Sequence, residues 1–254
     1  MDLVQKILVP VAAVLIFLGL WEGLVWVNQW PNYKMASPSD LPEAFWKFRW
    51  LFLEGAWATL WRTVLGLVLA VVFGTALGMI MGFSKLARDA LYPLLVGFNA
   101  VPKATLVPVI ALIFIGQHDF NTVLMAFLIS FFPIAVSVGI GLSTLEPEYR
   151  DILAALGANK VTIFRKIALP KTLPEFFGAL KVSVTLAFIG TNLVEIVSPH
   201  GRGLGALFLS GQTNSDYPLM FAVLISLAVL GILLYYAVVA LESIFAGWAE
   251  RSPS

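Results

Sequence analysis

The sequence predicts an all-α membrane protein with six transmembrane helices. Of the 254 residues, 59% are hydrophobic and only 12% are charged, whereas a soluble domain carries about 25% charged residues. The apolar residues also gather in runs of roughly the 20 residues that a helix needs to cross a bilayer. The predicted spans are residues 7–27, 57–83, 91–116, 121–142, 175–197 and 219–246.

The first run has no small-residue cleavage site behind it, so we interpret it as an uncleaved transmembrane helix. Glu22 within it is expected to have a structural role against a neighbouring helix, because a charge inside a span is costly when unpaired. Residues 40–54 mix tryptophan and phenylalanine with charges, which predicts a helix in the membrane interface.

The second span carries a small residue at every fourth position from residue 66 to residue 82. Small residues let helices approach closely in lipid, where packing replaces the hydrophobic effect. The partner of this seam is either another helix of the same chain or a second copy of the chain. The seam residues are Gly66, Ala70, Gly74, Gly78 and Gly82.

The third span contains Pro102 and Pro108, which remove backbone hydrogen bonds. We therefore expect a break or kink that is buried in protein. Lys103 lies beside this break and is expected either to pair with a carboxylate or to face a water-filled pathway.

The orientation follows from lysine and arginine in the short loops. Loops 84–90 and 143–174 together carry seven of these residues, against four on the opposite side, three of which lie in the loop after the first span. An even number of spans places both termini on the side of the seven. This predicts cytoplasmic termini.

Residues 149–174 predict two short amphipathic helices joined at Gly157, with Asn159 capping the second and Pro170 ending it. Such a segment suits docking into a groove of a partner protein. An amphipathic loop resting on the membrane is the alternative.

Gly157, followed after nine residues by "IALP" at 167–170, resembles the EAA loop of binding-protein-dependent ABC importer permeases. Asp-Ile-Leu at 151–153 stands where that family usually has Glu-Ala-Ala. Four further segments resemble the nitrate, sulfonate, taurine and bicarbonate branch of the family, in the same order along the chain. They are "SPSDLPEAF" at 37–45, the second span at 59–84, "VPKATLVPVIALIFIGQ" at 101–117 and "GRGLGALFLSGQ" at 201–212.

The resemblance implies a type I ABC importer permease architecture in the bacterial cytoplasmic (inner) membrane. Residues 1–56 would form an N-terminal helix and interfacial segment, 57–246 the permease core with a coupling loop at about 145–174, and 247–254 a cytoplasmic tail. The loop would dock on the ATPase through Asp151, Ala154, Ala155, Gly157, Ala158, Phe164, Ile167, Leu169 and Pro170.

The implied partners are a second permease copy in a homodimer, two cytoplasmic ATPase subunits, and a periplasmic or lipid-anchored substrate-binding protein. ATP and magnesium would bind to the ATPase subunits, because no stretch of this chain fits the P-loop pattern. We expect no catalytic or metal site here, and no cofactor in this chain, which has no cysteine and two widely separated histidines.

The implied function is import of a small polar or anionic solute of the nitrate, sulfonate, taurine or bicarbonate class. A vitamin precursor or an aromatic acid is the alternative for the same machinery. A secondary transporter or channel is a remoter alternative, which would predict inverted repeats or many intramembrane ion ligands.

Five residues are candidates for the solute pathway or its gate: Arg62, Lys103, Thr191, Asn192 and Glu195. Glu195, at the outer end of the fifth span, is expected to be a gate or interface group, or else to form a structural salt bridge with Arg62. Arg62 alone could instead extend to the interface. The polar groups of Thr191 and Asn192 either line a pathway or hydrogen-bond to neighbouring helices.

Overall fold

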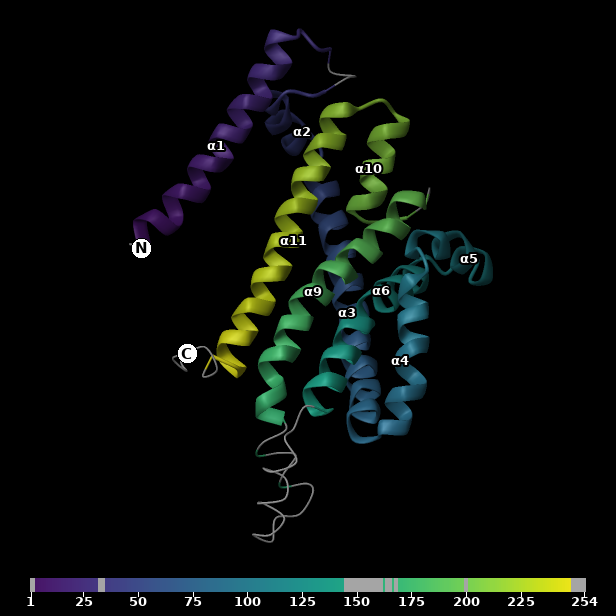
Figure 1. The fold of residues 1–254 in the computed structure, drawn as a ribbon. Helices are drawn as coiled ribbons and strands as arrows, with labels where there is room; N and C mark the ends of the chain where they lie inside the picture. Colours follow the sequence, from purple (N-terminus) through teal and green to yellow (C-terminus); the bar gives the residue numbers. More distant parts are fainter. Residues whose placement is uncertain are drawn as a thin grey trace. The chain divides into compact units, whose positions relative to one another are not determined.

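The computed structural model describes residues 3–31, 35–143, 162, 166, 169–198 and 201–247, and these residues form helices and connections without a strand (Figure 1). The longer helices carry the labels of Figure 1. They are α1 (Leu3–Val27), α2 (Leu41–Lys47), α3 (Arg49–Phe83), α4 (Lys85–Ala100), α5 (Leu106–Ile113), α6 (His118–Ser143), α9 (Leu169–Val197), α10 (Leu204–Thr213) and α11 (Tyr217–Phe245).

Four of these helices are long and apolar enough to cross a membrane: α3, α6, α9 and α11. A bent pair, α4 with the helical residues Lys103–Ile113, would be a fifth span. The all-helical membrane fold is therefore confirmed. The apolar part of α1, Val11–Val27, is shorter than a full span, so the predicted count of six remains a prediction.

The expected break in the third span is present, but its residues 101–105 are mostly exposed in this chain rather than buried, and only one of the two prolines lies at it. The helix axis bends by 75° between α4 and the segment that begins at Lys103, directly after Pro102. Pro108 lies in the first turn of α5, where a missing N–H costs nothing. The expectation that Pro108 also interrupts the helix was wrong.

Helix α3 begins at Arg49, earlier than the predicted residue 57. The predicted interfacial helix 40–54 is instead divided between α2, which ends at Lys47, and the first turns of α3. Likewise α9 begins at Leu169 rather than at residue 175. Pro170 lies in its first turn, where proline is tolerated, whereas Pro174 lies inside the helix.

The contacts divide the chain into two compact units. The first unit comprises Met1–Ala58 and Ile196–Ala228, and the second comprises Thr59–Glu195 and Val229–Ser254. These units are defined only by contacts within the chain. The division into an N-terminal segment, a permease core and a tail, with boundaries at residues 56 and 246, therefore remains a prediction.

In the first unit, Glu22 of α1 has the structural contacts expected of it. Its carboxylate accepts hydrogen bonds from the backbone N–H and the hydroxyl of Ser39, at 3.1 and 3.0 Å. Gly55 lies against the backbone of Gly203 and Leu204, where a Cβ atom would approach to 3.3 Å. The glycine-rich segment before α10 therefore packs directly on the start of α3.

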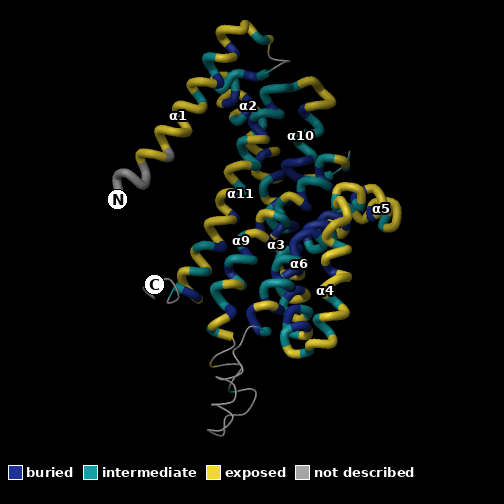
Figure 2. The backbone as a smooth tube through the Cα atoms, viewed as in Figure 1, coloured by how far each residue is buried: buried dark blue, intermediate teal, exposed yellow. Residues whose placement is uncertain are grey.

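In the second unit, α6 forms much of the core, and its tube in Figure 2 is largely coloured as buried. The glycine seam of α3 packs against α6, because a Cβ atom at Gly66 would lie 2.5 Å from Ala126 Cβ, and one at Gly78 would lie 2.7 Å from Val138 Cβ. The seam thus joins two helices of the same chain, which is the first of its two predicted uses.

Candidate functional site

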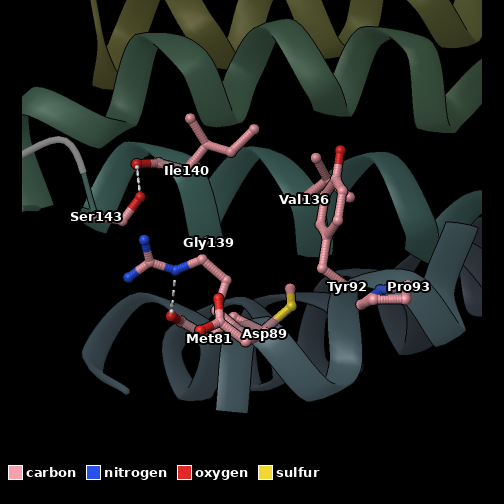
Figure 3. Close-up of a pocket in the computed structure, with 9 residues that line it drawn as sticks. Met81, Asp89, Tyr92, Pro93, Val136, Gly139, Ile140 and Ser143 are labelled. Atoms are coloured by element: carbon pink, nitrogen blue, oxygen red, sulfur yellow. Dashed lines mark hydrogen bonds between the residues drawn. The ribbon is translucent and has the colours of Figure 1, made fainter. Parts of the chain in front are cut away.

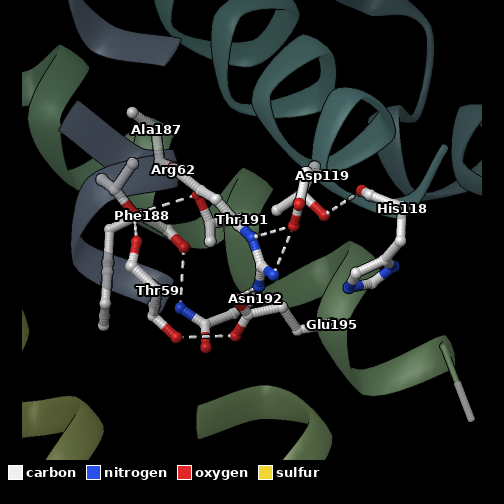
Figure 4. A network of polar contacts seen from close by, with 11 residues as sticks. Thr59, Arg62, His118, Asp119, Ala187, Phe188, Thr191, Asn192 and Glu195 are labelled. Carbon is white, nitrogen blue, oxygen red and sulfur yellow. Dashed lines mark hydrogen bonds and ion pairs between the residues drawn. The ribbon is translucent and has the colours of Figure 1, made fainter. Parts of the chain in front are cut away.

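A buried carboxylate lies near the end of α9 and is paired with two side chains of α3 (Figure 4). Glu195 is fully buried, and Arg62 is only 3% exposed. Arg62 Nη1 donates to Glu195 Oε1 at 3.0 Å, and Thr59 Oγ1 donates to Glu195 Oε2 at 2.8 Å. The predicted salt bridge is therefore present, whereas the alternative that Arg62 extends to the interface was wrong.

Arg62 also contacts α6. Its Nε donates to Asp119 Oδ1 at 2.9 Å, and the Asp119 side chain is 62% exposed. One guanidinium thus joins a fully buried carboxylate of α9 to a solvated carboxylate of α6, and its planar fork suits such a double contact. Asp119 was not identified from the sequence, since an acid in the first turn of a helix is ordinary.

His118 is the first residue of α6. It is half-buried, and its Nε2 has no hydrogen-bond partner among the described residues. It lies beside Asp119 in Figure 4, without a contact that would add it to the network of Arg62.

A second polar contact between α3 and α9 lies one helical turn after Thr59 on α3 and one turn before Glu195 on α9. Thr63 Oγ1 is 2.9 Å from Thr191 Oγ1, and both residues are fully buried. Thr59 and Thr63 are four residues apart on α3, and Thr191 and Glu195 are four apart on α9. Because such spacing places side chains on one helical face, a single helix contact brings all four together.

Asn192 has a different environment from Thr191. Its Nδ2 donates to the Phe188 carbonyl of the same helix at 2.8 Å, while its Oδ1 is buried without a partner among the described residues. Of the two predicted uses, Thr191 therefore hydrogen-bonds to a neighbouring helix, whereas the side-chain amide of Asn192 bonds within its own helix.

Lys103 stabilises the break of the third span. Its ammonium donates to the carbonyls of Phe98 and Val101, at 2.5 and 3.1 Å. It also lies 4.6 Å from the centre of the Phe98 ring. Carbonyls at the end of α4 lack α-helical partners, and Lys103 bonds to the Phe98 carbonyl of that end, which also accepts the Val101 N–H, and to the Val101 carbonyl just beyond it. No carboxylate pairs with it in the described part of the chain.

A third ion pair within the apolar helices was missed. Lys181 Nζ of α9 lies 2.8 Å from Glu242 Oε2 of α11, and both side chains are largely buried. The sequence did indicate these two residues, because a lysine and a glutamate inside predicted spans are costly unless they are paired.

The coupling segment lies mostly outside the described residues, including Asp151, Ala154, Ala155, Gly157, Ala158, Phe164 and Ile167. Leu169 and Pro170 are described and form the first turn of α9. Within the described residues, no group of acids or histidines could hold a metal ion.

Residues 70–246 match the family model described as "Binding-protein-dependent transport system inner membrane component". The formylaminopyrimidine transport permease protein ThiX of Halalkalibacterium halodurans is 32% identical over 95% of this chain and 96% of its own.

Two further relatives carry other transport names. The riboflavin transport system permease protein RibX of Chloroflexus aurantiacus is 30% identical over 94% of this chain and 89% of its own. The nitrate import permease protein NrtB of Synechocystis sp. is 27% identical over 74% of this chain and 67% of its own. Among solved structures, the MetNI methionine ABC transporter in inward-facing conformations aligns over 77% of this chain and 96% of its own, with a TM-score of 0.64 and 21% identity.

Proposed function

The chain belongs to the family of binding-protein-dependent transport system inner membrane components, the permease subunits of ABC importers, and we propose that it forms half of a solute pathway between two copies of itself. Two ATPase subunits would bind ATP and magnesium, and an external binding protein would deliver the solute. Both termini would lie in the cytoplasm of a bacterium, below the cytoplasmic (inner) membrane.

The observation that supports this proposal is the continuity of helix α9. It is continuous over 29 residues, a length of about 43 Å. Its first turn, at Leu169 and Pro170, belongs to the predicted coupling segment, and Glu195 lies in its last turn. A movement imposed on the coupling segment by an ATPase would therefore reach the buried Arg62–Glu195 pair through one rigid element.

We assign Arg62, Glu195 and Thr191 to a brace that joins α3 to the start of α6 and to the last turns of α9, rather than to solute contacts. Their burial supports this assignment, because a fully buried carboxylate paired with arginine is not available to a solute. Asn192 remains the candidate for a pathway contact, since its Oδ1 has no partner in the described residues. Lys103 would hold the bend beside the pathway.

For the solute we propose a nitrogen heterocycle of the vitamin-precursor class. The relatives of higher identity and coverage are named for formylaminopyrimidine and riboflavin transport. A small inorganic or organic anion is the second candidate, favoured by the nitrate permease. Sulfonate, taurine and bicarbonate fall in that second class.

The test is uptake into liposomes that contain the permease, its ATPase subunits and its binding protein. We expect ATP-dependent uptake of a labelled pyrimidine or flavin and no uptake of nitrate. Nitrate uptake without heterocycle uptake would reverse the order of the two classes. Uptake that persists without ATPase subunits would contradict the ABC mechanism.

Coupling is tested separately with Gly157→Pro in the same liposomes. Proline would disrupt the turn predicted between the two short helices, so solute-stimulated ATP hydrolysis should fall at least tenfold. The control is Gly97→Ala, a substitution at an exposed helical glycine where an added Cβ atom would have no neighbour within 4 Å. Full stimulation with Gly157→Pro would remove the loop from the mechanism.

The brace is tested with a disulfide, because the natural chain has no cysteine. Thr63 and Thr191, whose hydroxyls are 2.9 Å apart, would both be replaced by cysteine and oxidised. A brace keeps α3 and α9 together throughout the cycle, so uptake should continue. If uptake stops and returns on reduction, the two helices separate during transport and the pair acts as a gate.

A further inference from the structure

A cavity of about 470 Å³ lies between α3, α4 and α6, away from the buried network of Arg62 (Figure 3). Its walls are mostly apolar, and Figure 3 shows the Tyr92 ring beside Val136. Its polar groups come from the first turns of α4 and the last turn of α6. The lining residues are Met81, Arg88, Asp89, Tyr92, Pro93, Val136, Gly139, Ile140 and Ser143.

The cavity lies at the level where three membrane helices end or begin. Helix α3 ends at Phe83, α4 begins at Lys85, and α6 ends at Ser143. The ends of spanning helices lie near the phospholipid head groups, where arginine and tyrosine are favourable. By the loop charges this is the predicted cytoplasmic boundary.

The cationic group of the cavity, the guanidinium of Arg88, is partly free. Arg88 Nε donates to the Met81 carbonyl at 3.1 Å, and this bond fixes the guanidinium at the cavity. The two terminal nitrogens of Arg88 and the hydroxyl of Tyr92 have no hydrogen-bond partner among the described residues. A phosphate group accepts hydrogen bonds from such donors strongly.

The surface beside the cavity is apolar. Ile140, which lines the cavity, is 47% exposed, and Leu86, two residues before Arg88, is 82% exposed, which suits contact with acyl chains. A cationic pocket between membrane helices on the cytoplasmic side is the kind of site that binds anionic head groups. Asp89 at the rim is an acceptor for head-group hydroxyls, as in phosphatidylglycerol.

We propose that this cavity binds an anionic phospholipid, with the phosphate on Arg88 and an acyl chain along α4 and Ile140. The lipid would join the start of α4 to the end of α6. It would thus act next to the predicted coupling segment, which follows Ser143 in the sequence.

The test is native mass spectrometry of the full permease with its ATPase subunits, titrated with phosphatidylglycerol or phosphatidylcholine. We expect preferential retention of phosphatidylglycerol, and about fivefold weaker binding with Arg88→Gln, since one basic residue near a membrane surface contributes about that factor. Lys85→Gln removes the same charge from the same helix start outside the cavity and should leave binding unchanged. Equal losses of phosphatidylglycerol binding in both variants would mean that only the general surface charge matters, and this would contradict a specific site at Arg88.

Ile140→Trp keeps every charge and the Arg88–Met81 contact but fills the cavity. It should weaken phosphatidylglycerol binding as well. Such a loss could not be caused by destabilisation of the protein through Arg88→Gln, so it would assign the binding to the cavity. Equal retention of phosphatidylcholine would overturn the proposal. Displacement by soluble glycerol 3-phosphate would do so too, because it would assign the cavity to a free phosphate ester.

Discussion

Helix α3 contacts two neighbours in the second unit by different chemistry. Against α6 it presents glycines, and a Cβ atom at Gly74 or Gly78 would lie 2.8 or 2.7 Å from a backbone oxygen of α6. Against α9 it presents Thr59, Arg62 and Thr63, whose side chains form hydrogen bonds of 2.8–3.0 Å to buried partners on that helix.

The two contacts differ in how they specify the fold. Backbones that approach closely gain many weak dispersion contacts, so the glycine contact depends on shape along four turns or more. The polar contact depends on a few atoms, and a buried charge that loses its partner is costly. We therefore expect single substitutions to have larger effects at the α3–α9 contact, although it involves fewer residues.

The largest effect is expected for Glu195→Ala. Arg62 would keep the solvated Asp119, but its charge would remain buried without its carboxylate partner on α9. Loss of one member of a buried pair costs about 3–5 kcal/mol. Heating the purified permease in detergent and measuring the monodisperse fraction by size-exclusion chromatography would give the loss of stability.

The matched variant replaces both members of the pair, Arg62→Met with Glu195→Met. Removing both charges avoids an unpaired one, so this double variant should be more stable than Glu195→Ala alone. If the double variant were the less stable of the two, the pair would contribute net stability, and the argument from the unpaired charge would not hold.

The next largest effect is expected at the other contact, for Gly78→Ala. The added methyl would lie 2.7 Å from the Ala135 carbonyl oxygen, so α3 and α6 must move apart, at a cost of about 1–3 kcal/mol. Gly97→Ala in α4 adds the same methyl where nothing lies within 4 Å and should be neutral or stabilising. The same thermal assay compares them, and equal stability of the two variants would contradict close packing at Gly78.

These two contacts also show how far the sequence could predict the structure. The spacing of the glycines on α3 predicted a close helix contact, but spacing has no information about the partner helix. Arg62 and Glu195 were suspected as a pair because both are charged and near the same membrane boundary. Asp119 could not be found in this way, since its role depends on the position of the start of α6 beside α3.

The break at Pro102 was predicted because proline removes a helical hydrogen bond. The role of Lys103 was not, because its partners are backbone carbonyls, which every residue has and no sequence pattern marks. Lys181 and Glu242 were visible as charges inside spans, and only their adjacency required the fold. The chemistry of side chains was thus predictable here, and one pair across helices, Arg62 with Glu195, was expected, whereas the pairs Arg62–Asp119 and Lys181–Glu242 became visible only in the fold.

The smallest effect is expected for Thr191→Val, which removes a hydroxyl from the α3–α9 contact without leaving a charge unpaired. Thr63 retains its bond to the Thr59 carbonyl at 2.7 Å, so the interhelical bond that is lost is the one between the two hydroxyls. Such interhelical bonds contribute about 0.6 kcal/mol in membranes. Thr185→Val is the control, because its hydroxyl donates to the Lys181 carbonyl of its own helix at 3.2 Å. Thr191→Val should be slightly less stable than Thr185→Val in the thermal assay. A loss as large as that of Glu195→Ala would instead mean that the hydroxyls, not the ion pair, hold α3 to α9.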